Sequence, residues 1–420
     1  MIGGEIPAAC QNELCQGDYV NKRLTSLIIS AVLLMTAVFT CTASAMTSVP
    51  AIGAQSAVLI DAETGEVLLD KSMNMTEFPA STTKMMTALL AIENLDLDDA
   101  VTCGPDVMKA DGTILELHTG EKLTVEQLLY GMMLKSSNDA AVALAEAVSG
   151  NIEDFADLMN KRAAEIGCTG THFVSPNGLP DDNHVTTAHD LALIASEAMK
   201  NPTFAKIVKT KTYTIPATNM YEARKVKNSN QLLTGTGTVQ VDGAERPVRY
   251  GGIKGIKTGY TNAAQSCLVA DAERGGLDII SVTLKASYYD QYPDAIKILD
   301  WGFANFEALT IIHKNEAVTH SAVKHGRNSK VGLVPGKDIN MTVEKTADGT
   351  NYTKEDFTYK TDSKELTAPV KKGTKAGTVT VYRQGQKMGT YDLVTQNSVE
   401  ESFFYSMLGK ITGLWHSIAG

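Results

Sequence analysis

Strand-like patterns lie on both sides of a long helical region, and this order constrains the possible folds more than any other feature of the chain. Residues 56–72 predict two strands, because two apolar runs flank a glycine-containing turn. Residues 125–137, 139–150 and 189–200 predict helices, since their apolar side chains recur at a spacing of three to four. Strand signals return in residues 249–286. This order predicts an α+β fold whose antiparallel sheet takes its two edges from the two ends of the domain.

The character of the sequence changes after about residue 313. Apolar and polar residues alternate in residues 339–344, and residues 378–394 have the pattern of a hairpin that turns at a glycine. No helical pattern interrupts this stretch up to about Thr395. We therefore predict a separate small all-β domain.

Length and charge narrow the class of protein. The chain has 420 residues, of which 43% are hydrophobic and 20% charged, so it can form two or three domains with a sizeable core. A formal net charge of -10 argues against nucleic acid as a partner, because nucleic-acid binding needs a basic surface. An anionic substrate would have to meet local positive charge.

The N-terminal region has the features of an export signal. Lys22 and Arg23 precede an apolar run over residues 24–39, and Ala43 and Ala45 are the small residues of an A-x-A-like cleavage site. We expect cleavage after Ala45 and a mature protein outside the cytoplasm. An uncleaved membrane anchor is the alternative, although the run is short for a bilayer span. A start codon assigned too far upstream would account for the residues before the run.

Residues 401–420 combine an apolar stripe with a narrow polar face. This pattern is typical of an interfacial helix that lies on a membrane, and a helix docked on its own protein is the alternative. The stripe consists of Phe403, Phe404, Met407, Leu408, Ile411, Leu414, Trp415 and Ile418.

Cysteines and histidines provide neither a disulfide framework nor a metal motif. Only Cys103, Cys168 and Cys267 follow the proposed cleavage site, so at most one disulfide can form. Cys267 lies in an apolar strand pattern and is expected to be a buried structural thiol. His184 and His189 do not share a helix face, and no H-E-x-x-H motif occurs. We predict no metal and no cofactor.

Ser81 and Lys84 share one face at the start of an amphipathic helix pattern. This S-x-x-K pair is a weak signal by itself, because both residue types are common and Ser321 with Lys324 matches it too. In the alternative interpretation, Ser81 caps the helix and Lys84 is solvated.

Two more motifs follow Ser81 in the chain. The first is S-x-N at residues 136–138, between two predicted helices, and the second is K-T-G at residues 257–259, on a predicted strand. S-x-N is a weak pattern, since Ser175 and Asn177 also match it, but K-T-G occurs once. The order S-x-x-K, S-x-N, K-T-G matches the motif triplet of penicillin-recognising serine enzymes.

The first residues of this set have the chemistry that acyl transfer to a serine requires. Ser81 is the expected nucleophile and Lys84 its base, if burial and the charge of Lys257 lower the pKa of Lys84. Ser136 can relay a proton to the leaving amine. Asn138 can orient Lys84 and the substrate amide.

The residues of the K-T-G strand have the chemistry of a substrate-binding edge. Lys257 attracts an anionic substrate, and Thr258 offers its hydroxyl to a substrate carboxylate. Gly259 lets the substrate lie along the strand, because it has no side chain. The backbone N–H groups of Ser81 and Tyr260 are the expected oxyanion donors.

From residue 51 to about residue 306 the chain resembles the low-molecular-mass penicillin-binding proteins that act as D-alanyl-D-alanine carboxypeptidases. The resemblance implies a serine beta-lactamase/DD-peptidase-like catalytic domain. It also implies removal of the terminal D-alanine from peptidoglycan pentapeptide through an acyl-enzyme on Ser81, with beta-lactams as inhibitors that acylate the same serine. Besides the triplet, the resemblance rests on DAETGEVL, FPASTTKMMTALLAIE, LLYGMMLKSSNDAAVALAE, GCTGTHFVSPNGL, HDLALIA, GIKTGYTNAA and LDWGF.

The chain departs from this family at two places. Some relatives have an arginine that helps to hold the substrate carboxylate where this chain has Lys285, which lacks the bidentate fork of arginine. Some relatives have a histidine after K-T-G, where this chain has Tyr260.

Other functions are compatible with the same motifs. A beta-lactamase shares the triplet but needs a carboxylate to activate water, for which the sequence offers no strong candidate. A DD-transpeptidase or endopeptidase would use the same site on a different substrate. A non-catalytic penicillin sensor or wall-binding module would not need both lysines.

The expected organisation has four regions and places the enzyme on the outer face of the cytoplasmic membrane, held there peripherally by its last helix. The regions are a cleaved signal region at 1–45, the catalytic domain at 46–312, the β-rich domain at 313–398 and the amphipathic helix at 399–420.

Overall fold

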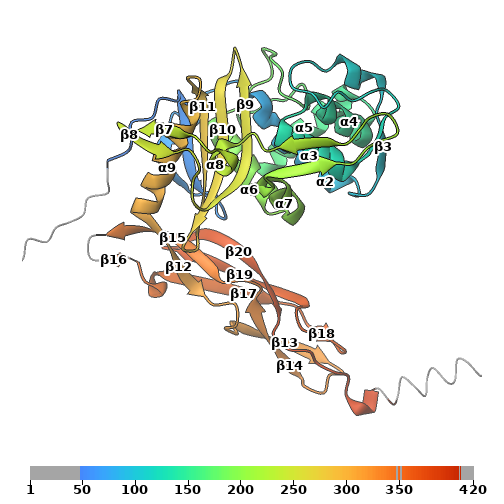
Figure 1. The fold of residues 1–420 in the computed structure, drawn as a ribbon. Coiled ribbons are helices and arrows are strands. Elements are labelled where there is room, and N and C mark those ends of the chain that lie inside the picture. The colour runs from blue at the N-terminus through green and yellow to red at the C-terminus, as the bar shows by residue number, and fades with distance from the viewer. Residues whose placement is uncertain (1–47, 347–348, 351, 406, 408–420) are drawn as a thin grey trace, which may run out of the picture. The chain divides into compact units, whose positions relative to one another are not determined.

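The computed structural model of the chain describes residues 48–346, 349–350, 352–405 and 407 (Figure 1). The predicted signal region at 1–45 lies outside the described residues, as does most of the predicted helix at 399–420. Strands β1 (Ser56–Asp61) and β2 (Val67–Lys71) confirm the first predicted strand pair.

A five-stranded antiparallel sheet organises the catalytic part of the chain, in the order β2-β1-β11-β10-β9. The early strands β1 and β2 join three late strands, because β1 pairs along its length with β11. The sheet therefore combines strands from both sides of the helical region, as predicted, but its edges are β2 and β9, whereas the last strand, β11, lies at its centre. The late strands are β9 (Ile253–Thr261), β10 (Gln265–Arg274) and β11 (Leu277–Ala286).

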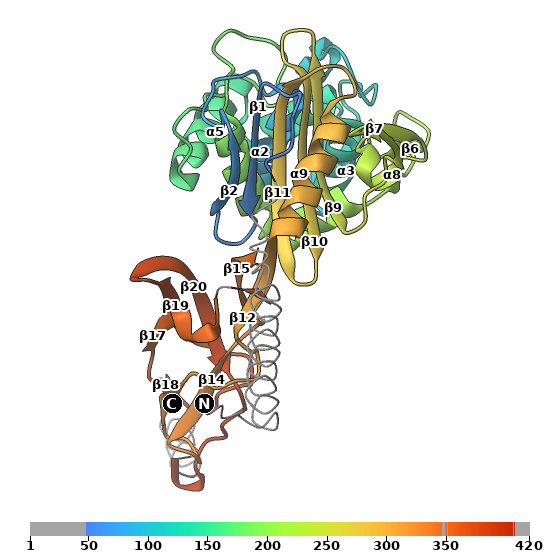
Figure 2. The same ribbon diagram turned by 90° about the vertical axis from the view of Figure 1, so that its left-hand side faces the viewer.

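Helices cover both faces of this sheet, which explains why all six residues of β1 are buried. Helix α9 (Gln291–Asn305) lies across β10 and β11 on one face (Figure 2). On that face Leu268 and Ala270 of β10 share a core with Leu299 of α9. The alternate residues of β10, such as Val269, belong to the larger core formed with the other helices.

The helical region packs around helix α2, whose first eight residues are all buried. The predicted helices α3, α4 and α6 are confirmed, whereas α5, α7 and three short hairpins between β3 and β8 were not predicted. The helices are α2 (Lys84–Asn94), α3 (Val125–Lys135), α4 (Asn138–Ser149), α5 (Ile152–Ile166), α6 (Ala188–Met199), α7 (Pro202–Lys209) and α8 (Gln231–Thr234). The hairpin strands are β3 (Ala100–Thr102), β4 (Lys122–Thr124), β5 (Thr212–Ile215), β6 (Arg224–Lys227), β7 (Thr238–Val241) and β8 (Ala244–Pro247).

The C-terminal part is rich in β-strands, as predicted. Strand β12 (Phe306–Ile312) pairs with β15 (Ile339–Thr346), and a six-stranded sheet has the order β17-β19-β20-β14-β13-β18. A short 3-10 turn at Lys354–Asp356 corrects the expectation of an uninterrupted β stretch. The other strands are β13 (Thr319–Lys324), β14 (Lys330–Pro335), β16 (Gly349–Thr350), β17 (Phe357–Ser363), β18 (Leu366–Thr367), β19 (Lys375–Arg383) and β20 (Gln386–Thr395).

The second S-x-x-K match lies on strand β13 of this C-terminal part. Ser321 is buried and its hydroxyl donates to the backbone carbonyl of Lys364, whereas Lys324 pairs with Glu365 at the surface. Residues three apart on a strand point to opposite faces, so this match does not form a Ser–Lys pair.

Candidate active site

Ser81 lies in a 3-10 turn, Ala80–Thr83, that leads directly into α2. The helix start was therefore predicted one turn too early, and the side chain of Ser81 does not cap it. The turn is held closely by a neighbouring loop. A Cβ added to Gly178, whose φ is +80°, would lie 1.9 Å from the carbonyl oxygen of Ala80, so only glycine fits there.

Lys84 is completely buried, with 0% of its surface exposed. Its Nζ lies 2.8 Å from Ser81 Oγ, and it donates to Asn138 Oδ1 at 2.6 Å and to the backbone carbonyl of Asn177 at 2.8 Å. Burial, and then the charge of Lys257, lower the pKa of Lys84 well below its ordinary value, against an opposing effect of Asp139. This geometry excludes the alternative in which Lys84 is solvated.

The link between α3 and α4 carries the second motif. Ser136 ends α3 in the left-handed conformation, with φ of 70°, and its Oγ accepts a hydrogen bond from Lys257 Nζ at 2.9 Å. Asn138 begins α4, and its Nδ2 donates to the carbonyl of Asp111 at 2.5 Å. The motif therefore joins both lysines, since Ser136 contacts one and Asn138 the other.

The third motif lies on β9, the edge strand beside the Ser81 turn. Lys257 is 1% exposed, and burial lowers its pKa to about 7. A Cβ added to Gly259 would lie 3.1 Å from the backbone nitrogen of Ser81, so the strand passes directly alongside the nucleophile. The hydroxyls of Thr258 and Ser229 lie 2.8 Å apart, and Tyr260 is half exposed.

One cavity of about 370 Å³ brings the nucleophile and the strand residues together. Among the described residues its lining includes no acidic side chain, and Lys135 is its one charged side chain. The described lining residues are Ser81, Thr113, Lys135, Ser136, Ser229, Gln231, Thr258, Gly259, Tyr260, Ser266, Tyr288, Tyr289, Gln291 and Tyr292.

The sequence motifs do not include several residues that shape this site. Asn177, set aside above as part of a chance S-x-N match, contributes its backbone carbonyl to Lys84. Thr113 and Ser229 line the cavity from loops without any motif. Lys285, which stands where some relatives have an arginine, places its Nζ 3.4 Å from the carboxylate of Glu77 and does not line the cavity.

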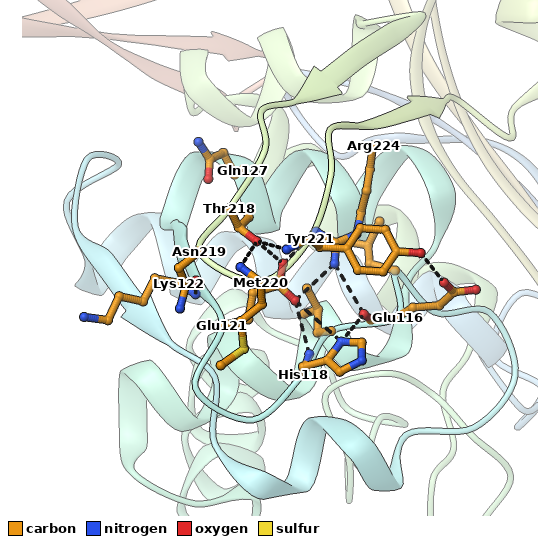
Figure 3. Close-up of polar contacts among 12 residues, drawn as sticks. Glu116, His118, Glu121, Lys122, Gln127, Thr218, Asn219, Met220, Tyr221 and Arg224 are labelled. Atoms are coloured by element: carbon orange, nitrogen blue, oxygen red, sulfur yellow. Dashed lines mark hydrogen bonds and ion pairs between the residues drawn. The ribbon is translucent and has the colours of Figure 1, made fainter.

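A buried ion pair between Glu121 and Arg224 joins the segment just before β4 to the start of β6 (Figure 3). Glu121 accepts from Arg224 Nη1 at 2.7 Å and Nη2 at 3.0 Å, and also from Thr218 Oγ1 at 2.7 Å. The ring of Tyr221 covers the guanidinium, with 3.9 Å from its centroid to Cζ. No sequence motif marks this pair, because its two members are about a hundred residues apart.

The described cysteines and histidines have structural surroundings. Cys103, Cys168 and Cys267 are free thiols, and Cys267 is fully buried as predicted. His184 accepts from the backbone nitrogen of Val174 at 3.1 Å and lies 2.8 Å from Thr83 Oγ1. Within the described parts of the chain, no three His, Cys, Asp or Glu side chains are arranged to hold a metal ion.

Comparison with known proteins gives consistent matches over nearly the whole chain. A family model described as D-alanyl-D-alanine carboxypeptidase matches residues 43–288, and one described as penicillin-binding protein 5, C-terminal domain, matches residues 306–401. The D-alanyl-D-alanine carboxypeptidase DacF of Bacillus subtilis is 31% identical over 404 residues, which cover 94% of this chain and 99% of the relative.

Solved structures give the same picture. Penicillin binding protein 5 from Haemophilus influenzae has a TM-score of 0.59 and 29% identity, and the match covers 84% of this chain and 99% of that one. The Streptomyces K15 DD-transpeptidase has a TM-score of 0.56 and 35% identity, with 61% of this chain and all of that one covered.

Proposed function

Because this chain belongs to the family of serine-type D-alanyl-D-alanine carboxypeptidases, we propose that it hydrolyses the terminal D-Ala-D-Ala bond of peptidoglycan stem peptides through an acyl-enzyme on Ser81. The observation that carries this proposal is the 2.8 Å contact between Lys84 Nζ and Ser81 Oγ, inside a cavity where all three motifs meet. In this proposal Ser81, Lys84, Ser136 and Asn138 do the chemistry. Lys257, Thr258, Gly259 and Tyr260 bind the substrate.

The first step is attack by Ser81 on the penultimate D-alanine carbonyl. Neutral Lys84 accepts the proton from Ser81 Oγ as the new C–O bond forms, which its lowered pKa favours. The carbonyl oxygen becomes an oxyanion, for which the backbone N–H groups of Ser81 and Tyr260 are the proposed donors.

The second step breaks the C–N bond. The leaving nitrogen needs a proton, and Ser136 is the proposed relay because it hydrogen-bonds to Lys257 at 2.9 Å. Asn138 holds Lys84 at 2.6 Å and keeps it oriented during the transfer. Free D-alanine departs, and a water molecule then hydrolyses the ester and regenerates Ser81.

Recognition of the substrate carboxylate falls to β9 in this proposal. Thr258 places its hydroxyl in the cavity beside Ser229, and Lys257 supplies positive charge next to it. Lys285 is not part of the proposed site, because its Nζ lies beside Glu77 and outside the cavity lining.

The alternative functions differ in what cleaves the acyl-enzyme. A beta-lactamase would need a carboxylate to activate water, and the described lining of the cavity has none. A transpeptidase would pass the acyl group to an amine, as the name of the similar Streptomyces K15 enzyme implies for that protein. Hydrolysis and transfer share every residue described above, so the fate of the acyl group must be measured.

The decisive experiment gives the purified protein a peptide that ends in D-Ala-D-Ala, with and without an amino-acid acceptor, and separately a penicillin. We expect D-alanine release without the acceptor and a covalent penicillin adduct on Ser81. Release that depends on the acceptor would identify a transpeptidase, and rapid loss of the adduct with penicillin turnover would identify a beta-lactamase.

The family acts on peptidoglycan, which lies outside the cytoplasm, and we propose that this chain is exported and held at the membrane by its C-terminal helix. In support, Phe403 and Phe404 at the described start of this segment are 84% and 60% exposed. None of the helices in the described part of the chain has the length and apolar character needed to cross a bilayer. The domain boundaries after residues 45, 312 and 398 stay predictions.

A further inference from the structure

The end of helix α3 places in the active-site cavity a lysine that none of the three motifs includes. Lys135 is the last residue of α3 and directly precedes Ser136. It is exposed, and it lines the same cavity as Ser81. Since it lies one position outside the S-x-N motif, the motif by itself gives it no role.

Lys135 is an unpaired positive charge in an otherwise neutral lining. The other described residues that line the cavity are serines, threonines, tyrosines, glutamines and one glycine. In the described part of the chain, no carboxylate forms an ion pair with Lys135. A charge without a counter-charge gives the cavity a positive potential, which attracts an anion although the net charge of the chain is -10.

The two other lysines considered for substrate binding are not available in the cavity. Lys257 is 1% exposed and is not a lining residue, and its Nζ already donates to the carbonyl of Thr258 at 2.8 Å. Lys285 lies beside Glu77 and outside the lining. Among the described residues, Lys135 is therefore the cation that a ligand in this cavity can contact directly.

A short series of contacts connects the end of α3 to Thr258. The carbonyl of Leu134, the residue before Lys135, accepts from the backbone nitrogen of Ser229 at 2.9 Å. Ser229 Oγ lies 2.8 Å from Thr258 Oγ1, and both residues line the cavity together with Lys135. Because the stem of a lysine is long and flexible, its ammonium can reach a group that is bound at these two hydroxyls.

The combination of two hydroxyls and an ammonium group fits a carboxylate. Each hydroxyl has one donor, and the contact between Ser229 and Thr258 uses one of the two, so one donor is left for a ligand. A carboxylate has two acceptor oxygens. One oxygen can accept from the hydroxyl pair, and the other can accept from Lys135. Such charge-assisted hydrogen bonds are stronger than those between neutral groups.

A purely structural explanation of Lys135 is the alternative. A lysine in the last turn of a helix interacts favourably with the helix dipole wherever that helix lies. Lys209 holds the same position at the end of α7, where it is exposed, and it does not line the cavity. The two lysines therefore share the helix effect and differ in access to a ligand.

We propose that Lys135 is a specificity-determining residue that binds the free carboxylate of the leaving D-alanine, together with the hydroxyl of Thr258. This inference rests on the proposed function and assigns the direct ionic contact with that carboxylate to α3, whereas Lys257 acts from behind β9. The contact is lost when D-alanine departs. Lys135 should therefore influence formation of the acyl-enzyme on Ser81, and it should not influence the later hydrolysis of the ester.

The test compares two thioesters of diacetyl-L-Lys-D-Ala that differ only in the charge of the leaving thiol. One thiol is mercaptoacetate, which carries a carboxylate, and the other is mercaptoacetamide, which is neutral. A thiolate leaves more easily than an amine, so turnover of both is measurable from the released thiol. We expect the full-length enzyme to have a kcat/KM at least about tenfold higher for the anionic thioester, and this preference should decrease with salt.

Three variants separate the charge of Lys135 from its place in the helix. Lys135→Met keeps the length of the side chain and removes the charge, so the anionic-to-neutral ratio of kcat/KM should fall about tenfold, with the value for the neutral thioester unchanged. Lys135→Arg keeps the charge and should hold the ratio within about threefold of the wild type. Lys209→Met is the matched control and should leave the ratio unchanged.

The outcomes separate the two proposals. A wild-type ratio near one, an unchanged ratio in Lys135→Met, or an equal loss on both thioesters would overturn the role of Lys135 and leave the carboxypeptidase proposal intact. Equal urea midpoints for Lys135→Met and Lys209→Met show that both variants are folded. The proposed function itself fails if the wild-type protein releases no D-alanine from diacetyl-L-Lys-D-Ala-D-Ala and penicillin forms no adduct on Ser81.

Discussion

Two buried lysines with different partners define the site at the scale of single residues. Lys84 contacts the hydroxyl of Ser81, whereas Lys257 contacts the hydroxyl of Ser136. Burial lowers the pKa of both, and the charge of Lys257 lowers that of Lys84 further. Because two positive charges close together in a buried site are costly, the pair favours a neutral Lys84 beside a charged Lys257.

Replacement of Ser81 tests the proposed nucleophile. Ser81→Ala should lower kcat for D-alanine release by at least about 1000-fold and abolish covalent penicillin labelling, because no acyl-enzyme can form. Mass spectrometry of the penicillin-treated protein measures the adduct directly. If the variant gained the same mass from penicillin as the wild-type protein, another residue would be the one that is acylated.

The two lysines predict a bell-shaped pH profile of kcat/KM. Activity should rise with pH as Lys84 loses its proton, well below the ordinary lysine value near 10.4. The activity should fall again above about pH 7, because Lys257 of the substrate-free enzyme then loses its positive charge. The neutral lysine no longer attracts an anionic peptide. Lys257→Arg, which stays charged, should move the falling limb to higher pH.

Initial rates at low substrate concentration across pH 5–11 measure this profile, and a substrate peptide whose C-terminus is a carboxamide serves as a control for substrate charge. The falling limb should be weaker for that neutral C-terminus. A profile that only begins to rise near pH 10 would contradict the assignment of Lys84 as the base.

At the scale of secondary-structure elements, the loops around the cavity depend on contacts between distant segments. Glu121 lies beside β4 and Arg224 begins β6, so their ion pair joins the two hairpins (Figure 3). The loop before Glu121 also places its backbone nitrogens on the carboxylate of Asp139, the residue after Asn138. The loop that places Thr113 in the cavity wall is thus held by two contacts. One is the Glu121–Arg224 pair, and the other is the set of backbone hydrogen bonds to Asp139.

Loss of the Glu121 carboxylate should therefore destabilise the fold. Glu121→Gln leaves Arg224 buried without a counter-charge, so the free energy of unfolding should fall by about 3 kcal/mol. Glu93→Gln removes a partner of Arg162 from a more exposed pair and should cost less than about 1 kcal/mol. Urea unfolding followed by circular dichroism measures both. Equal losses in the two variants would contradict the special role of the buried pair.

At the scale of the whole molecule, the matches to both family models account for a catalytic part and a β-rich part in one chain. Phe403, Phe404 and Met407 belong to the predicted apolar stripe, and each is exposed in the described structure. Tyr405, which is not part of that stripe, stacks on His325 with ring centroids 4.0 Å apart. The three described side chains of the stripe are therefore accessible to a membrane, as the proposed anchor requires.

Deletion of residues 401–420 tests the proposed anchor. The eight apolar side chains of the stripe each contribute on the order of 1 kcal/mol to interfacial binding, so the full-length protein should stay on membranes in moderate salt. The truncated protein should be released and still cleave small peptides. Fractionation measures this. Unchanged membrane association after deletion would indicate an uncleaved segment at residues 24–39, and release of the intact protein by salt would indicate an electrostatic contact.

The sequence by itself determined the fold class and the proposed catalytic residues, because these depend on local patterns. Strand-like stretches in residues 249–286 predicted β9, β10 and β11, and three short motifs identified Ser81, Ser136 and Lys257 without any knowledge of distance. The start of α2 was placed one turn early, since a 3-10 turn and an α-helix have nearly the same apolar spacing over four residues.

Only the tertiary structure decided which other groups surround Ser81. These groups come from segments far apart in the chain, and no local pattern marks them. They are the carbonyl of Asn177, the hydroxyl of Ser229 and the Glu121–Arg224 pair. The structure also decided against Lys285 as a cavity residue, since Glu77 lies beside it. Such contacts arise from the packing of distant segments, whereas a motif records only neighbours along the chain.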